Sequence, residues 1–173
     1  MKTLSARRYP NTRAGRLSEA EAETRRLAYA IKDPQSPAVE FALCAHEMAQ
    51  LITGPCWLVP IPNSQGSTRA NGLLAAQIAS FVPGAQVAHA LRRTRPVESQ
   101  CARHKANLGP TAVADHHIAA TGKYLGLRQV YFVDNVRTSG NTLAAAHAAL
   151  GTGAGLVFAS LDHATTTEQP TLF

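Results

Sequence analysis

The sequence predicts an α/β fold in which a mainly parallel, twisted sheet is flanked by helices. From Cys56 onward, short apolar runs alternate with helical patterns, and this alternation implies right-handed crossovers and a parallel sheet. A chain of 173 residues with 45% hydrophobic and 16% charged residues suits one domain with one core. We therefore expect a single domain over residues 18–165. A basic arm (1–17), mobile until it meets a partner, precedes it, and a tail (166–173) follows.

Two helices are expected at the start of this domain. The first covers residues 19–31, because Ser18 and Glu21 have the spacing of a capping box. The second begins with Ser36 as its N-cap and Pro37 at its first helical position. One face of this second helix is expected to consist of the apolar residues Val39, Leu43, Met48, Leu51 and Ile52.

Strands and helices then alternate along the rest of the domain. The predicted strands are 56–62, 86–93, 129–135 and 155–161, and the predicted helices are 72–81 and 141–151. The segment from Arg93 to Pro110 is long, polar and without periodicity, as is typical of a functional lid. Ligands bind at the carboxyl ends of parallel strands, so the loops after Val59, Leu91 and Val133 are the informative ones.

The net charge of +6 is concentrated in two segments, residues 1–26 and 92–105. Such clusters favour a polyanionic partner, either nucleic acid or a phosphorylated small molecule, although a solvated arm and loop would look the same. No apolar stretch is long enough for a membrane span or a secretory signal. Three widely spaced cysteines fit neither a disulfide framework nor a zinc site. We expect a cytoplasmic protein that makes no membrane contact.

The stretch VYFVDNVRTSGNT, residues 130–142, runs from a strand through a small-residue loop into a helix. A helix N-terminus with several free amides attracts an anion, and Gly140 lets a phosphate approach closely. Asp134, upstream of this cradle, could accept from two vicinal hydroxyls of a ribose. The lysine of a Walker loop is missing, and no dinucleotide fingerprint follows a strand. The loop therefore predicts a ribose 5-phosphate as its guest.

These 13 residues resemble the signature of type I phosphoribosyltransferases for 5-phosphoribosyl 1-pyrophosphate (PRPP). The stretches LVPIPNSQGSTRANGLLAAQIA and LRRTRPVESQ with RHKANL are similar to segments of the competence protein F (ComF-like) branch. Together with YAIKD, the resemblance covers residues 29–162. Two positions depart from the family: Asn135 replaces a second acid, and Arg69 is the single arginine of a loop that is richer in arginine in that branch.

The resemblance implies a phosphoribosyltransferase that moves a phosphoribosyl group between pyrophosphate and an unidentified nucleophile, for which a nucleobase is the expectation. It implies a helical hood over residues 19–52 that selects this acceptor. Magnesium would be bound mainly through PRPP, with no protein ligand. The implied PRPP-binding residues are Val136, Arg137, Thr138, Ser139, Gly140, Asn141 and Thr142. The implied pyrophosphate loop contains Asn63, Ser64, Gln65 and Arg69. The implied flexible-loop residues are Arg92, Arg93, Arg103 and His104, and the implied catalytic residues are Asp134, Asn135 and Lys105.

Several alternatives stay open at this point. Asn135 retains an acceptor for a ribose hydroxyl but lacks a charge, so a non-catalytic PRPP or nucleotide sensor linked to DNA uptake or repair is the second reading. Thr138 stands where purine-type members carry a general base, which leaves proton transfer to His104 or Lys105. A homodimer that shares the lid is compatible with the resemblance. His116 and His117 invite a metal site, but no ligand pattern accompanies them.

The last five residues, 169–173, form a Gln-Pro-Thr-Leu-Phe peptide. This peptide resembles the short segment that partners of bacterial sliding clamps insert into the clamp groove. Packing of its two apolar residues on their own domain is the alternative. We therefore count a sliding clamp, and DNA contacted through the basic arm, among the candidate partners.

Overall fold

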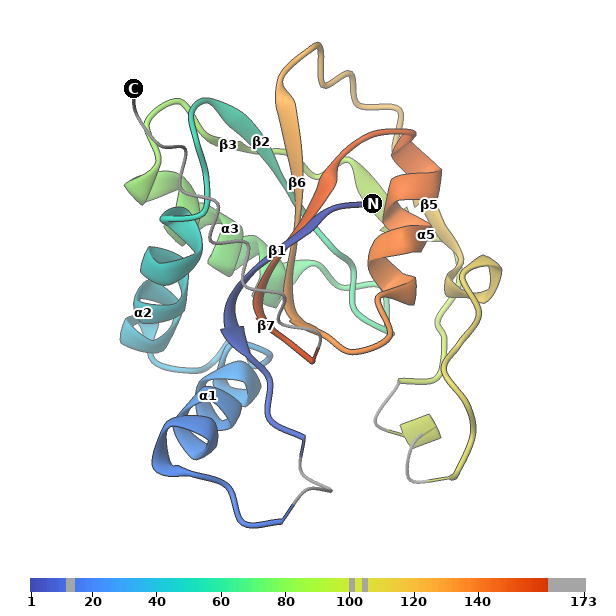
Figure 1. Ribbon diagram of the computed structural model, residues 1–173. Helices are drawn as coiled ribbons and strands as arrows, with labels where there is room; N and C mark the ends of the chain where they lie inside the picture. Colours follow the sequence, from blue (N-terminus) through green and yellow to red (C-terminus); the bar gives the residue numbers. More distant parts are fainter. Residues whose placement is uncertain (12–14, 100–101, 104–105, 162–173) are drawn as a thin grey trace, which may run out of the picture.

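The centre of the molecule is a five-stranded sheet in the order β1-β7-β6-β2-β3, with every neighbouring pair parallel (Figure 1). The computed structural model describes residues 1–11, 15–99, 102–103 and 106–161. The five strands are β1 (Thr3–Arg8), β2 (Cys56–Pro60), β3 (Gln86–Val87), β6 (Gln129–Arg137) and β7 (Ala154–Ser160). The predicted α/β class with a mainly parallel sheet is confirmed.

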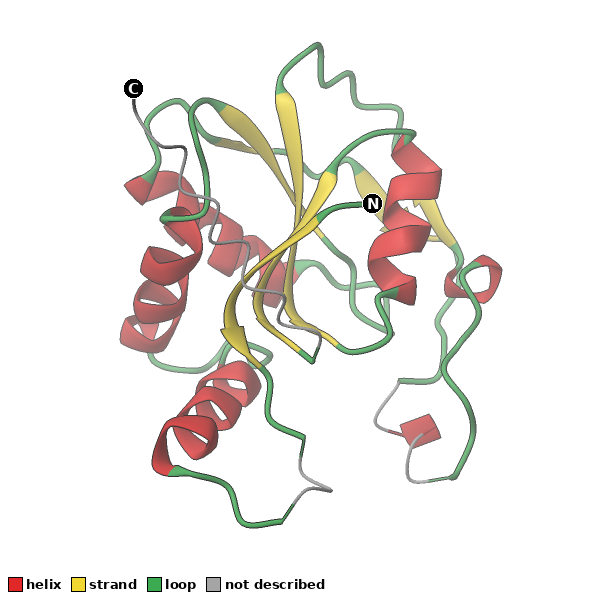
Figure 2. Ribbon diagram, in the orientation of Figure 1, coloured by secondary structure: helices red, strands yellow, loops and turns green. Residues whose placement is uncertain are grey.

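Helices cover both faces of this sheet (Figure 2). α1 (Glu19–Ala30), α2 (Ala38–Ala49) and α3 (Arg69–Phe81) share one hydrophobic core with the sheet, and α5 (Asn141–Leu150) packs on a second core. Successive strand residues point to opposite faces, so Leu58 belongs to the first core and Val59 to the second. Within the described ranges, no helix combines the length and the apolar character needed to cross a membrane.

The segment predicted as one strand over residues 86–93 is divided in two. β3 pairs with β2 only at its two residues, and the Ala90 amide then donates to the carbonyl of Ala88 (2.9 Å) in a tight turn. Ala88 and Ala90 are both buried, so packing of these two small side chains holds the turn in place. β4 (Leu91–Arg93) then leaves the sheet and pairs antiparallel with β5 (Ile118–Ala120), which follows the short 3₁₀ helix η1 (Ala114–His116).

The N-terminal residues 3–8, expected to lie in an arm outside the domain, form the edge strand β1. They pair in parallel with β7, from Thr3 opposite Gly155 to Arg8 opposite Ser160. The Arg7 guanidinium makes two hydrogen bonds to the Glu47 carboxylate (2.7 and 2.5 Å) and lies over the Phe158 ring. A basic side chain on this strand therefore has an intramolecular partner, which the count of charges could not show.

The two N-terminal helices follow the prediction in position but not in every detail. The capping box of Ser18 and Glu21 is present at the start of α1. Ser36 does not cap α2, because its hydroxyl donates to the carbonyl of Ala30 (2.8 Å) and Pro37 occupies the N-cap position. The predicted apolar face is also wrong at two positions, since Val39 and Leu43 are 62% and 51% exposed. Met48 is buried as predicted, together with Phe41, Cys44 and Ala45, and Leu51 and Ile52 lie beyond the end of the helix.

We predict that Arg7→Ala lowers the free energy of unfolding by about 1–3 kcal/mol, because it removes a partly buried, bidentate charged contact. Arg8→Ala is the matched control: Arg8 is the exposed next residue of the same strand, and its loss should change stability by less than about 0.5 kcal/mol. Urea denaturation of both variants measures the difference. Equal stability of the two would show that β1 does not depend on the Arg7 contact.

Candidate functional site

A pocket opens where β2 and β6 separate at their carboxyl ends. β2 ends at Pro60, the Ile61 amide still donates to the Val133 carbonyl (3.0 Å), and β6 then continues to Arg137 paired with β7 alone. The chain leaves β2 through α3 toward β3 on one side, and leaves β6 through α5 toward β7 on the other. This is a topological switch point, where open α/β sheets bind their ligands.

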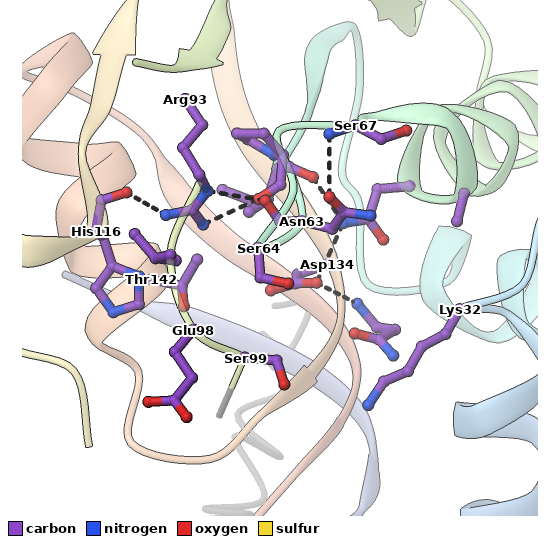
Figure 3. Close-up of a pocket in the computed structure, with 16 residues that line it drawn as sticks. Lys32, Asn63, Ser64, Ser67, Arg93, Glu98, Ser99, His116, Asp134 and Thr142 are labelled. Carbon is purple, nitrogen blue, oxygen red and sulfur yellow. Dashed lines mark hydrogen bonds between the residues drawn. The ribbon is translucent and has the colours of Figure 1, made fainter. Parts of the chain in front are cut away.

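The pocket has a volume of about 300 Å³, at the small end of the range for small-molecule sites. Figure 3 shows Asp134 near its centre, with Lys32 on one side and His116 and Glu98 on the other. The polar residues that line it are Lys32, Asn63, Ser64, Ser67, Asn71, Arg93, Glu98, Ser99, His116, Asp134, Asn135 and Thr142. Positive and negative side chains both face the cavity, so it suits a polar, charged ligand.

Asp134 is the acidic residue at the point where the two strands part. Its Oδ1 accepts hydrogen bonds from the Asn135 amide (2.9 Å) and from the Asn71 side-chain amide (3.2 Å). Burial raises the pKa of this carboxyl, and the two hydrogen bonds, together with the charges of Lys32 and Arg93, only partly offset the rise. The carboxylate therefore carries an unfavourable desolvation, which a ligand that donates hydroxyl hydrogen bonds would relieve.

Two helix N-termini open on the same pocket. α3 has Thr68 at its N-cap and α5 has Gly140, and neither cap makes a side-chain hydrogen bond to its helix. Ala70 and Asn71 from the first turn of α3, and Thr142 from the first turn of α5, line the cavity. The amides and the dipole of each helix end favour an anion. The pocket is thus prepared to bind negatively charged groups at two places on either side of Asp134.

The loop between β2 and α3 is shaped by Asn63. Its side-chain oxygen accepts from the backbone amides of Gln65 (2.9 Å) and Ser67 (3.0 Å). Its backbone amide donates to the Ser67 carbonyl (2.8 Å). This Asx-type turn brings Ser64 and Ser67 to the cavity wall. Gln65 and Arg69 are exposed and do not line the cavity.

Arg93, in β4, connects this loop with η1, the short helix before β5. Its guanidinium donates to the carbonyls of Asn63 (2.8 Å), Pro62 (3.2 Å) and His116, as the dashed lines to Asn63 and His116 show in Figure 3. Burial lowers the pKa of Arg93, while the nearby Asp134 raises it. Arg93 was expected in a flexible loop, but it lies in β4 and holds two segments of backbone together.

The Asn135 side chain has a structural partner. Its Nδ2 donates to the carbonyl of Ala28 in α1 (3.0 Å), and the residue is only 8% exposed. This bond joins the carboxyl end of β6 to the helix that supplies Lys32 from its C-terminal end. The amide nitrogen is therefore already engaged, and the remaining Oδ1 is the atom that could accept from a ligand.

The structure brings part of the predicted site together. The predicted residues that line the cavity are Asn63, Ser64, Arg93, Asp134, Asn135 and Thr142. Those described but outside the cavity wall are Gln65, Arg69, Arg92, Arg103, Val136, Arg137, Thr138, Ser139, Gly140 and Asn141. His104, Lys105 and the C-terminal peptide 169–173 lie outside the described residues.

Within the predicted phosphate loop, two residues take other positions. Val136 and Arg137 still belong to β6, and Val136 packs against the first core. The loop proper is therefore Thr138 to Gly140. Gly140 adopts a left-handed φ of 79° and lies under the Arg137 guanidinium, whose Nε would be 2.9 Å from a Cβ added there. Asn141 donates to the carbonyl of Thr111 (2.8 Å) and so ties α5 to the segment before η1.

Six polar residues of the cavity wall were not predicted as site residues: Lys32, Ser67, Asn71, Glu98, Ser99 and His116. Asn71 lies in the first turn of α3, where its amide donates to the Ile61 carbonyl (2.8 Å). Asn71 precedes the predicted helix 72–81 by one residue, so no helical pattern marked it as buried. The described residues contain no group of three or more His, Cys, Asp or Glu side chains arranged to hold a metal ion.

We predict that Asp134→Asn stabilises the protein. Burial raises the pKa of Asp134 above its ordinary value of 3.8. The free energy of unfolding therefore falls as pH rises from 3.8 to the higher pKa of the folded state. A neutral amide keeps the acceptor and avoids this cost, so at pH 7 we expect a gain of about 0.5–2 kcal/mol that disappears in acid. The exposed Asp115→Asn is the control. Thermal melts from pH 3 to 8 measure both, and a lower melting temperature for Asp134→Asn at pH 7 would contradict the prediction.

We predict that Asn135→Asp, which would introduce the second acid of the phosphoribosyltransferase signature, destabilises the fold instead. A carboxylate oxygen would replace the donor to the Ala28 carbonyl, beside the Asp134 carboxylate. The expected loss is about 2–4 kcal/mol in urea denaturation. Asn107→Asp, the same change at an exposed position, is the control and should shift stability by less than about 0.5 kcal/mol. Unchanged stability of Asn135→Asp would mean that the bond to α1 is dispensable.

Comparison with protein-family models, with curated proteins and with solved structures gives no match for this chain. No function can be transferred from a relative on that basis. The residues of the pocket, their hydrogen bonds and their charges are what any functional proposal must explain.

Proposed function

We propose that the chain is a PRPP-binding phosphoribosyltransferase of the type I class. It would transfer a phosphoribosyl group between pyrophosphate and a nitrogen nucleophile, with a nucleobase as the expected acceptor. The single observation that carries the proposal is the placement of Asp134 at the switch point between the N-termini of α3 and α5, whose N-cap residues make no side-chain hydrogen bond to their helices. PRPP has a matching chemistry: a ribose diol between a monophosphate and a diphosphate.

The ligand's orientation follows from the positions of these groups. The 5-phosphate would bind at the start of α5, with the amides after Gly140 and the Thr142 hydroxyl as donors. The ribose hydroxyls would donate to Asp134, and Asn135 Oδ1 would be a further acceptor. The pyrophosphate would lie toward Ser64, Ser67 and the first turn of α3. This arrangement uses both helix ends and leaves C1 of the ribose near the middle of the pocket.

The charges around Asp134 suit a reaction that develops positive charge on the ribose. In an oxocarbenium-like transition state the Asp134 carboxylate would stabilise the sugar ring. Lys32 and the α3 N-terminus would stabilise the departing pyrophosphate. Arg93 would act indirectly, because its donors already hold the carbonyls of Pro62, Asn63 and His116. Proton transfer by His104 or Lys105 stays a prediction, since both lie outside the described residues.

A magnesium ion fits this site only as a partner of the ligand. The carboxylates that line the pocket are Asp134 and Glu98, and Asp134 already accepts two hydrogen bonds. The ion would neutralise pyrophosphate oxygens and keep most of its other positions for water. The protein's own contribution is to position the ribose and to exclude solvent around it.

The acceptor would be selected by residues 19–52, the proposed hood. α1 lies beyond the carboxyl ends of the strands in Figure 1, and Lys32, just after this helix, lines the pocket. The bond between Asn135 and the Ala28 carbonyl fixes this helix to β6. A base bound under α1 would therefore be held in a fixed position relative to the ribose.

A second candidate function is that of a non-catalytic PRPP or nucleotide sensor, and the Asn135 side chain is the observation that favours it. The family's second acid is absent, and the amide that replaces it serves to hold α1. The linked DNA contact through the N-terminal segment has less support, because Arg7 pairs with Glu47. Homodimerisation and clamp binding stay predictions.

Calorimetry with PRPP and magnesium tests the proposal directly. We expect saturable binding by the intact chain and at least about tenfold weaker binding by Asp134→Asn, since a neutral acceptor replaces a charged one. Because this variant is expected to be the more stable one, weaker binding cannot be assigned to unfolding. Absence of binding at millimolar PRPP would rule out the transferase and a sensor of PRPP together, and would leave only a sensor of another nucleotide.

A second measurement separates those two functions. Pyrophosphate release from PRPP in the presence of mixed purine and pyrimidine bases should depend on the chain and fall by about tenfold or more in Asp134→Asn. PRPP binding without any release would favour the sensor.

A further inference from the structure

His116 is a buried side chain of the pocket wall that nothing in the proposed mechanism uses. It ends η1 and is 3% exposed. The next residue, His117, has a left-handed φ of 51°, and this turn directs the chain into β5. The His116 carbonyl is held by the Arg93 guanidinium. These backbone contacts therefore determine where the His116 ring lies in the pocket wall.

The ring lies on the side of the pocket that also carries Thr142 and Glu98 (Figure 3). Neither Nδ1 nor Nε2 has a hydrogen-bond partner of proper geometry among the described residues. Buried polar atoms without partners are destabilising, because they lose their hydrogen bonds to water without gaining others. Because His116, which carries both nitrogens, lines a polar cavity, a ligand that offers oxygen atoms there would supply the missing partner.

The charges around the ring favour its neutral form when the pocket is empty. Burial lowers the pKa of His116 and so does Arg93 on β4, while the Thr111 backbone and Asp115 raise it and His117 lowers it. Of the other groups on the cavity wall, Glu98 and Asp134 are acidic and Lys32 is basic. α5, which packs against η1, carries no acid in its first turn, and β5 has no titratable residue. An anion bound beside the ring would raise the pKa of His116 and favour its charged form.

We propose that His116 takes up one proton from solvent when a phosphorylated ligand binds, and then donates a ring N–H to a phosphoryl oxygen. The inference rests on the proposed function for the identity of the ligand. The proton step is balanced: neutral imidazole plus a solvent proton gives imidazolium, and no bond of the ligand breaks. A negative phosphoryl group at hydrogen-bonding distance stabilises the charged ring, so ligand affinity increases as pH falls.

The site therefore recognises the charge state of its ligand as well as its shape. Between the pKa of His116 in the empty pocket and its higher value in the complex, affinity should change by up to about tenfold per pH unit. The ligand's own second phosphate ionisation, near pH 6, changes affinity in the opposite direction. Comparison with a variant that lacks the imidazole removes this contribution, since the ligand's ionisation is common to both proteins.

The test is calorimetry at pH 7 in two buffers with different ionisation enthalpies. Inorganic pyrophosphate and ribose 5-phosphate are titrated separately, at constant magnesium, into the intact chain, His116→Asn and the control His117→Asn. Asparagine tolerates the left-handed backbone at position 117. We expect more proton uptake by the intact chain and by His117→Asn than by His116→Asn, with at least one probe. The probe that shows the difference identifies the phosphoryl group that contacts His116.

The outcomes separate this inference from the proposed function. If both probes bind and proton uptake is the same in all three proteins, the role of His116 is wrong and the proposed function stands. If neither probe nor PRPP binds, both are wrong. Should His116→Asn fail to fold, the imidazole carbon-bound protons of the seven histidines are followed by NMR in the intact chain. One ring must then change from neutral to charged on ligand addition at pH 7, and the absence of such a ring overturns the proposal.

Discussion

The separation of β2 from β6 after Val133 is the constraint on which the rest of the structure depends. Up to that point the two central strands satisfy each other's backbone groups, and their side chains build the two cores. Beyond it, β6 is held only by β7, so one edge of its last residues is open to a cavity. Backbone polar groups that lose a strand partner need another one. Asp134 and Asn135, whose side chains can hydrogen-bond backbone, stand at the place where this need arises.

The elements around the cavity compensate for that opening in different ways. Asn71 reaches from α3 to the Ile61 carbonyl, Asn135 reaches to α1, and Arg93 binds three carbonyls from two loops. Each of these side chains sits in the pocket wall, yet each serves the backbone. The groups of the wall still available to a ligand are the helix ends, the Asp134 carboxylate, Asn135 Oδ1, the hydroxyls of Ser64 and Thr142, Lys32 and His116. Preorganised donors of this kind bind an anion without a large entropic cost.

Much of the fold could be predicted because its signals are local. The capping box of Ser18, the apolar runs of β2, β6 and β7 and the glycine before α5 each determine an element within a few residues. The strand β1 could not be predicted, since its alternation of Leu4 and Ala6 is short and is followed by two basic residues, and the partner of Arg7, Glu47, lies 40 positions away. Likewise, Asp134 and Thr142 belong to one short stretch of sequence, whereas Lys32, Asn71 and His116 reach the pocket only through tertiary packing.

The N-termini of α3 and α5, whose N-cap residues make no side-chain hydrogen bond, have a consequence for how this sequence can evolve. Where main-chain amides rather than side chains bind a ligand, selection acts on the path of the backbone and not on the identity of each residue in the loop. Thr138, which is exposed and does not line the cavity, can be replaced, whereas the Ser139 hydroxyl accepts from the Asn141 amide (3.4 Å) and Gly140 must keep its left-handed conformation for α5 to begin where it does. Homologues that share this recognition would therefore be better found by the geometry of strand, glycine turn and helix than by similarity of sequence.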